Sequence, residues 1–333
     1  MDGRVRPFTG FLAVVTASVC MSVAHAEEAA LTPLPTGNTG IAAKYPDDTG
    51  IAKDPAVVFH DGFEEVTKAS ELNTKWDAGV FQERCIRIAE EPENRHGGRK
   101  ALEFTVPKQA EELSNAVAKK IKDEKEVLFL RYYSKFEKGF DQVGSSHNGS
   151  TICAHYFDNG RATPGVPADG KNKFLACFEN WRGEKEKKSP GDWNVYCYHP
   201  EQKDRFGDHF FPSGTVLPNS YERSGAKTFG KKFVERKDVI PELDRWYCHE
   251  FMLKANTVGK RDGRIACWID GKLIADFPNL RLRDVENLKI DRFGIELHIG
   301  SNTVRENKKW FDDVVAATSY IGPMVEKSPP RKK

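Results

Sequence analysis

The chain has 333 residues, of which 39% are hydrophobic and 30% are charged, with 51 Lys and Arg against 49 Asp and Glu. This composition excludes a disordered or collagen-like chain, and a formal net charge of +2 is too small for a dedicated nucleic-acid binder. No apolar run reaches the roughly 18 residues that a membrane-spanning helix needs, so the sequence predicts no membrane span.

The first 26 residues have the pattern of a secretory signal peptide. Arg4 and Arg6 supply the positive start, residues 8–23 form a mostly apolar stretch, and Ala-His-Ala at 24–26 is a small-residue cleavage motif. Cleavage after this motif would leave 333 − 26 = 307 residues. We therefore predict that the protein is secreted or periplasmic.

Strand signals dominate the rest of the chain. Residues 27–55, rich in Pro, Thr, Gly and Asp, are interpreted as a linker that partly docks on the domain, and residues 324–333 as a disordered tail. The expected helix covers 108–120. Strands are expected at 57–60, 101–106, 127–136, 174–181, 193–199, 246–254, 264–270, 291–299 and 311–320. Strands without long intervening helices predict an all-β domain over 56–323, an antiparallel β-sandwich or jelly roll with few short helices.

Six cysteines follow the expected cleavage site, and an exported protein can pair them. Two pairs sit at the centres of successive expected strands, where opposed residues of antiparallel neighbours come within about 4.5–5.5 Å. The sequence therefore favours the disulfides Cys177–Cys197 and Cys248–Cys267. The alternative is that these cysteines are free, buried thiols.

Alternation along the strands separates an apolar face from a polar one. In 127–136 the apolar side holds Leu128, Leu130, Tyr132 and Phe136, and the other side holds Phe129, Arg131, Tyr133 and Lys135. In 291–299 the apolar side holds Phe293, Ile295, Leu297 and Ile299, and Arg292, Glu296 and His298 lie opposite. If Cys177 and Cys197 face each other, the far side of their hairpin holds Phe178, Asn180, Arg182, Tyr196 and Tyr198.

Tyrosine beside arginine on several strands favours a ligand-binding face over a merely solvated one. A sugar ring offers apolar patches to an aromatic side chain, and a sugar carboxylate fits the planar guanidinium group. The sequence therefore predicts an acidic carbohydrate as the partner. Paired carboxylates in the E-x-D-x-x-E pattern of laminarinase-type hydrolases are absent from the sequence, which disfavours glycoside hydrolysis.

Several segments together resemble secreted polysaccharide lyases with a concanavalin A-like jelly roll, notably the alginate and glucuronan lyase group. They are VLFLRYYSKFEKGFDQVGSSHNG at 127–149, Tyr196-Cys-Tyr198, ACWIDGKLI at 266–274, FGIELHIG at 293–300 and WFDDVVAATSYIG at 310–322. The likeness covers roughly 55–322 in the order of elements. In those lyases a Gly-Gly-Lys-Leu-Pro-Gly type loop carries a catalytic lysine. Here Ser146 takes the place of that lysine, with His147 alongside.

The resemblance implies β-eliminative cleavage of an acidic polysaccharide and a proton-transferring tyrosine on the Tyr-x-Tyr strand, and the chemistry of the reaction suggests roles for the other polar side chains. Arg131 or Arg182 would neutralise the substrate carboxylate, His147 would be the base, and Tyr196 or Tyr198 the acid. His298, two residues from Glu296, is an alternative base. Binding of the polymer is assigned to Tyr133, Lys135, Asn180, Arg182, Arg292 and Glu296.

Other readings of these residues stay open at this point. Arg131 can simply pair with a carboxylate, and the two tyrosines can pack under a loop with their hydroxyl groups hydrogen-bonded. No cofactor is expected to be required, although Asp312 and Asp313 can bind calcium or cap a turn. A second function, from another class, is a non-catalytic carbohydrate-binding or adhesion module with the same face.

Overall fold

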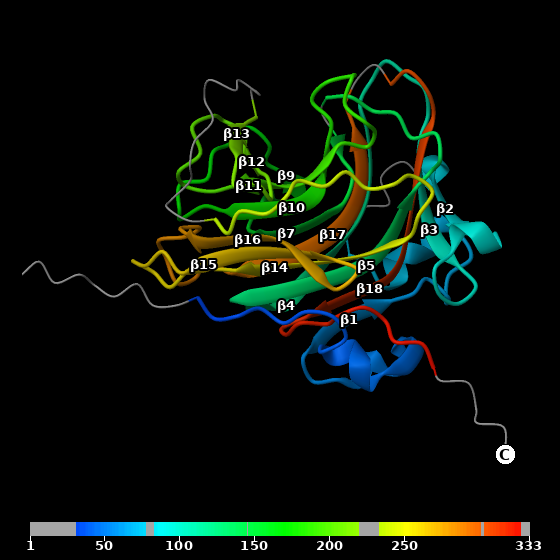
Figure 1. Ribbon diagram of the computed structural model, residues 1–333, viewed down its shortest axis with the longest axis horizontal. Helices are drawn as coiled ribbons and strands as arrows, with labels where there is room; N and C mark the ends of the chain where they lie inside the picture. Colours follow the sequence, from blue (N-terminus) through cyan, green and yellow to red (C-terminus); the bar gives the residue numbers. More distant parts are fainter. Residues whose placement is uncertain (1–30, 78–82, 145, 220–232, 301–302, 328–333) are drawn as a thin grey trace, which may run out of the picture. The chain divides into compact units, whose positions relative to one another are not determined.

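The computed structural model describes residues 31–77, 83–144, 146–219, 233–300 and 303–327. Contacts divide the chain after Leu34, and the residues from Pro35 onward form one compact unit. That unit is an antiparallel β-sandwich of the jelly-roll type, as the strand pattern predicts (Figure 1). Among the described residues, no helix is both long and apolar enough to cross a membrane. The expected signal peptide, 1–26, lies outside the described residues.

One sheet, sheet A, has the strand order β16-β15-β14-β5-β18-β3-β2, and β1 pairs with β18. Its strands are β1 Val57–Asp61, β2 Ile86–Ala89, β3 Ala101–Val106, β5 Val127–Phe136, β14 Tyr247–Lys254, β15 Gly263–Ile269, β16 Lys272–Leu280 and β18 Asn307–Ala317. All of these pairings are antiparallel, so neighbouring strands can be joined by turns as well as by crossovers.

The other sheet, sheet B, has the order β13-β12-β11-β10-β7-β17-β4, and β6 pairs with β17. Its strands are β4 Leu113–Lys125, β6 Ser146–His147, β7 Ser150–Ala154, β10 Phe174–Trp181, β11 Asp192–Tyr198, β12 Asp208–Phe210, β13 Val216–Pro218 and β17 Ile290–Ile299. A small hairpin, β8 Phe157–Asp158 with β9 Arg161–Ala162, stands apart from both sheets.

Helical structure in the described residues is confined to short 3-10 turns. These are η1 Ile41–Lys44, η2 Pro46–Asp48, η3 Ile51–Lys53, η4 Ala69–Thr74, η5 Glu83–Cys85 and η6 Pro92–Asn94. The hydrophobic core lies between the sheets and draws on both of them. It includes Leu128 and Leu130 of β5 together with Phe293 and Ile295 of β17, which confirms the alternation predicted for both strands.

The helix predicted over 108–120 is wrong, because this segment contributes to the long strand β4, which pairs with β17. Leu113, Val117 and Ile121 are its buried core residues, spaced by four. A spacing of four fits one side of a helix, and it equally fits every second inward position of a strand. The segment pairs with β17 along its length, so it is a strand and not a helix.

The N-terminal segment predicted as a linker packs against the outward side of sheet A. Arg131 of β5 is fully buried and pairs with Asp48 of η2, and its guanidinium also donates to the Asp313 carbonyl oxygen at 3.0 Å. The amides of Ile41 and Ala42 donate to the carbonyl oxygens of Tyr320 and Ile321. The outward side of sheet A is therefore closed by chain at these positions.

The C-terminal end of the described chain joins this cover. Of the segment predicted as a disordered tail, Met324 donates its amide to the Tyr133 hydroxyl at 2.8 Å, and Lys327 donates to Asp47 Oδ1 at 3.1 Å. Residues 328–333 of the tail lie outside the described residues. These contacts with the N-terminal turns and with β5 attach the first residues of the tail to the domain.

The two predicted disulfides are wrong, because the strands pair in a different register. Cys177 lies opposite Tyr196, and Cys197 lies opposite Ala176. Cys267 lies opposite Phe251 of β14, a residue three positions beyond Cys248. An odd offset in register moves one member of each pair to the other face of the sheet, so Cys197 and Cys267 belong to the main core whereas Cys177 and Cys248 do not. All six described cysteines are free and buried.

We therefore expect a protein that begins at residue 27 and is denatured without reductant to titrate with thiol reagent at all six cysteines. Two disulfides would leave 6 − 4 = 2 reactive thiols and would contradict the register. The control is the same titration after full reduction, which sets the maximum.

Candidate functional site

The outward face of sheet B holds a group of polar and aromatic side chains. On β10, Ala176 and Phe178 belong to the main core, so Cys177 and Glu179 point outward. Cys177 packs instead in a separate cluster with Tyr196 and Tyr198 of β11. We call this group the polar face of sheet B; it consists of His147, Thr151, Cys177, Glu179, Tyr196, Glu296 and His298.

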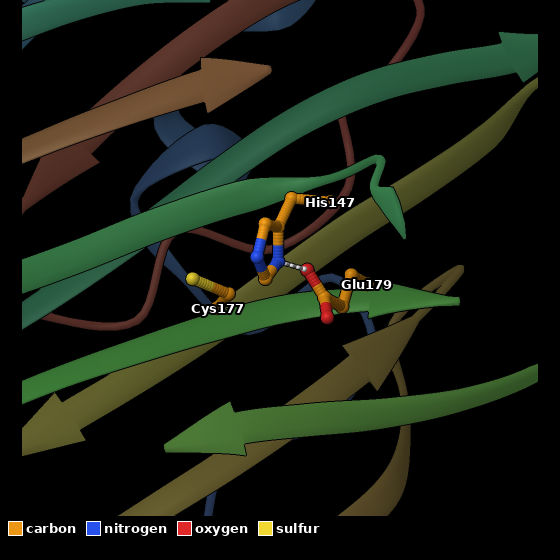
Figure 2. A group of neighbouring side chains, drawn as sticks. All are labelled: His147, Cys177 and Glu179. Atoms are coloured by element: carbon orange, nitrogen blue, oxygen red, sulfur yellow. Dashed lines mark hydrogen bonds and ion pairs between the residues drawn. The ribbon is translucent and has the colours of Figure 1, made fainter. Parts of the chain in front are cut away.

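A buried carboxylate fixes His147 at the centre of this face. His147 Nδ1 lies 2.9 Å from Glu179 Oε2, with 31% of the imidazole side chain exposed but only 1% of the Glu179 side chain (Figure 2). Burial alone would lower the pKa of His147. The charge and hydrogen bond of Glu179, with the charge of Glu296, outweigh burial and raise this pKa to about 9. At neutral pH, His147 is therefore a partly accessible cation.

A clamp between two chain segments places His147 over Glu179. Asn180 donates its amide to Asn148 Oδ1 at 2.9 Å, and Asn148 Nδ2 donates to the Asn180 carbonyl oxygen, also at 2.9 Å. At Gly149 a Cβ atom would lie 1.9 Å from the Phe178 carbonyl oxygen, so this close approach needs glycine. Asn180, predicted to bind substrate, is buried and takes part in this clamp.

His298 of β17 lies opposite His147 of β6 in the sheet, and their ring centres are 5.5 Å apart. Burial and the positive charge of His147 lower the pKa of His298, and they outweigh the nearby carboxylates of Glu296 and Glu112. His298 is therefore neutral at neutral pH and able to accept a proton. Two neighbouring imidazoles thus differ in charge, one positive and one neutral.

Tyr196 and Tyr198 lie next to this pair and are buried, with 5% and 1% of the residue exposed. The Tyr196 ring centre is 5.1 Å from that of His147. The two hydroxyl groups accept amide hydrogens from Gly207 and Gly165, each at 3.1 Å. The Tyr196 hydroxyl also hydrogen-bonds with the hydroxyl of Tyr198. Burial raises the pKa of Tyr196, so its hydroxyl stays protonated.

Thr151, Cys177 and Glu296 continue the polar face. Thr151 Oγ1 donates to Glu296 Oε1 at 2.7 Å and lies 3.2 Å from Cys177 Sγ. Arg292, predicted to bind substrate, lies on the same side of β17 as Glu296, and its guanidinium is 4.4 Å from the centre of the Phe157 ring. Glu296 and Arg292 thus lie on the outward side of β17, as predicted.

Three predicted site residues, Arg131, Tyr133 and Lys135, belong to sheet A and not to the polar face. Lys135 Nζ hydrogen-bonds to Asn94 Oδ1 at 3.2 Å and lies over the Trp310 ring, and Arg131 and Tyr133 hold the terminal segments. Arg182, also predicted, closes the loop between β10 and β11 through Asp141 and the Lys187 carbonyl oxygen. The expectation that Arg131, Tyr133 and Lys135 share one surface with His147 is wrong.

Two residues that the sequence analysis missed complete the neighbourhood. Glu179 would have been found from the alternation of Ala176 and Phe178, which places every odd residue of β10 outward. Lys173, which precedes β10, lies 4.7 Å and 4.8 Å from the ring centres of Tyr156 and Tyr198. Burial lowers the pKa of Lys173 to about 8. No local sequence pattern points to Lys173.

The carboxylate oxygens of Asp312 and Asp313, the pair considered for calcium, have partners within the protein. Asp312 accepts the amides of His96 and Gly97 at 2.9 Å and 3.1 Å, and the amide of Asp313 at 2.8 Å. Asp313 Oδ2 lies 2.8 Å from His96 Nδ1. These contacts favour the interpretation that the pair caps a turn.

A cleft of about 740 Å³ lies away from the polar face, beside β4. Lys119 contributes to its wall but donates to the Lys75 carbonyl oxygen and to Asp77. Phe293, a core residue, closes the other side. The ionisable side chains that line this cleft are lysines and aspartates, with no histidine or tyrosine among the described lining residues, so we place the candidate site on the polar face.

No protein-family model matches the chain, and no curated protein matches it significantly. Solved structures share its fold. The alginate lyase Aly36B has a TM-score of 0.56 at 16% identity, covering 82% of this chain and 99% of its own. The marine PL-14 alginate lyase from Aplysia kurodai has a TM-score of 0.53 at 13% identity, covering 79% and 99%.

The alginate lyase vAL-1 from Chlorella virus has a TM-score of 0.51 at 16% identity and covers 79% of this chain and 99% of its own. A mutant Aly36B structure, with a TM-score of 0.55 at 16% identity and covering 78% and 97%, is a complex with alginate trisaccharide. At these identities the comparisons establish a lyase-like jelly-roll fold.

The raised pKa of His147 predicts a pH-dependent contribution to stability. The folded-state pKa of about 9 exceeds the ordinary value of 6.5, so the stabilisation is complete below about pH 6.5 and is lost as the pH rises through about 9. We expect the difference in free energy of unfolding between the wild type and His147→Gln, measured with urea, to shrink over this range. A difference that stays constant between these pH values would show that Glu179 does not raise the pKa of His147.

Proposed function

We propose that the protein cleaves an acidic, uronate-containing polysaccharide by β-elimination on the polar face of sheet B. The observation that carries the proposal is the adjacent pair of imidazoles, His147 protonated and His298 neutral at neutral pH, beside the protonated phenol of Tyr196. Neighbouring groups with pKa values driven apart are what acid–base catalysis uses. The fold shared with alginate lyases supports the substrate class by analogy.

The first requirement of β-elimination is to acidify the proton on the carbon next to the carboxylate. His147 carries a positive charge and can donate an N–H to that carboxylate, while Glu179 holds its other nitrogen. This role replaces the expected role of base, because a group protonated below about pH 9 does not accept a proton at neutral pH. His298, the alternative base in the sequence analysis, takes that role.

The remaining steps of the reaction use His298 and Tyr196. His298 removes the proton, and the electron pair left on carbon forms a carbon–carbon double bond as the bond to the glycosidic oxygen breaks. Tyr196, with its ring beside His147, donates its hydroxyl proton to the leaving oxygen. Solvent then returns a proton to the phenolate and takes one from His298.

A non-catalytic carbohydrate-binding module is the second candidate, and two observations favour it. Ser146 stands where the resembled lyases carry a lysine, and the hydroxyl groups of Tyr196 and Tyr198 already accept loop amides. Glycoside hydrolysis has weaker support. Glu179 and Glu296 share the polar face, but each carboxylate is hydrogen-bonded, to His147 and Thr151 respectively.

The proposal also places the protein outside the cytoplasm, where such polymers occur. This part rests on the signal-peptide pattern of residues 1–26 alone. Detection of a mature N-terminus at residue 27 in the periplasmic or secreted fraction would support it.

Incubation with alginate, glucuronan or ulvan should produce ultraviolet absorbance from a double bond conjugated to the carboxylate. We expect His298→Ala to lower kcat/KM by about 10²–10⁴-fold, the usual contribution of a general base. His155→Ala, a histidine bonded to Glu124 at an exposed position, is the control and should retain activity. Reducing ends without this absorbance would favour hydrolysis, and retention on the polymer without any product would favour the binding module.

The pH dependence of the same reaction separates the two roles proposed for His147. If the imidazolium binds the carboxylate, kcat/KM falls as the pH rises through about 9, and Glu179→Gln moves this fall to lower pH because the pKa of His147 drops. If His147 were the base, kcat/KM would instead rise toward that pH.

A further inference from the structure

Three side chains of the polar face carry the donor atoms that transition metals prefer. One ligand atom each of His147, Cys177 and Glu179 lies within 4.8 Å of the others. The imidazole lies between the thiol and the carboxylate, and Cys177 and Glu179 extend from the same side of β10 (Figure 2). The donors are thus nitrogen, sulfur and oxygen, all held by strands rather than by loops.

A buried carboxylate oxygen without a hydrogen-bond partner is a second, independent observation at this cluster. Glu179 is 2% exposed, and its Oε1 atom has no hydrogen-bond partner among the described residues. Burying a carboxylate oxygen without a donor is costly, so such atoms in folded proteins are normally paired. Oε2 is hydrogen-bonded to His147, so Oε1 is the carboxylate oxygen that has no partner among the described residues.

The thiol of Cys177 packs beside Tyr196 and Tyr198 and makes one polar contact. It is 3% exposed, and it faces Thr151 Oγ1 at 3.2 Å. The Thr151 hydroxyl hydrogen is donated to Glu296, so the Cys177 thiol is the donor in its contact with Thr151 Oγ1. Burial raises the pKa of this thiol, and a bound metal ion would deprotonate it.

We propose that the polar face binds a divalent cation of the zinc class, with His147, Cys177 and Glu179 as protein ligands. Thiolate, imidazole and carboxylate together are ligands of zinc, whereas calcium and magnesium take oxygen ligands. Zinc with three protein ligands keeps a fourth position open. Glu296, joined to this group through Thr151, borders the site.

Metal binding would have a consequence for the proposed reaction, and this consequence rests on the proposed function. The ion takes His147 and Glu179 out of the ion pair that would receive the substrate carboxylate, so it inhibits β-elimination. The metal site itself does not depend on the reaction. Its test therefore uses no substrate.

The test is a titration of the purified, metal-free protein with Co²⁺, whose bond to a thiolate gives a near-ultraviolet charge-transfer band. We expect a band that saturates at one equivalent, that Zn²⁺ removes and that the same concentration of Ca²⁺ leaves unchanged. Cys177→Ser should abolish it. Cys248→Ser is the matched control, since Cys248 is also free and 3% exposed but lies in sheet A, and it should retain the band.

Glu179→Gln should weaken Co²⁺ binding by about 10–100-fold, the effect usual for a residue that ligates or orients a ligand. Circular dichroism of each variant shows whether it is folded. Absence of the band from the wild-type protein, or its persistence in folded Cys177→Ser, would overturn the proposal. A protein that degrades no uronate polymer but shows the band would retain the metal site and lose only the lyase function.

Discussion

The buried carboxylate of Glu179, 2.9 Å from His147, is the interaction on which the electrostatics of the polar face depend. It keeps His147 charged, and that charge in turn lowers the pKa of the neighbouring His298 and brings the pKa of His209 to about 3, in each case together with burial. Burial is the larger cause for His298 and His209, so this one acidic side chain keeps His147 charged and only adds to the effect of burial on the other two imidazoles. Loss of its charge would leave the group without a fixed proton donor and acceptor.

Backbone register decides which side chains can take part in this group. Cys177 lies opposite Tyr196, so both point outward together with Glu179, while Cys197 turns into the core. The clamp between Asn148 and Asn180 then brings His147 over Glu179. The site is therefore built from backbone pairing and one side-chain clamp, and its chemistry follows from what that geometry places together.

Sequence alternation predicted which side of a strand each residue lies on, but it did not predict which strands belong to the same sheet. The inward residues of β5 and β17 were predicted correctly, since burying one side of a strand imposes a period of two. Arg131 and His298 were also assigned correctly to the outward sides. Alternation carries no information on which sheet a strand joins, and Arg131 proved to lie in sheet A.

The other misassignments have similarly specific causes. A pair of cysteines at strand centres does not fix register, and an odd offset reversed the face of Cys197. The spacing of Leu113 and Val117 fits a helix as well as a strand. Alternation along β10 places Glu179 outward, but it does not reveal the contact with His147, 32 positions earlier in the chain, that gives Glu179 its role.

The outward sides of the two sheets differ in how far the chain covers particular residues. The terminal segments cover β5 through Arg131 and Tyr133, whereas His147 in sheet B remains 31% exposed on its side chain. The most direct test of the account is a crystal structure of His298→Ala with a uronate oligosaccharide. The account predicts a sugar carboxylate within hydrogen-bond distance of His147. An oligosaccharide bound in the cleft beside β4, with His147 uncontacted, would contradict it.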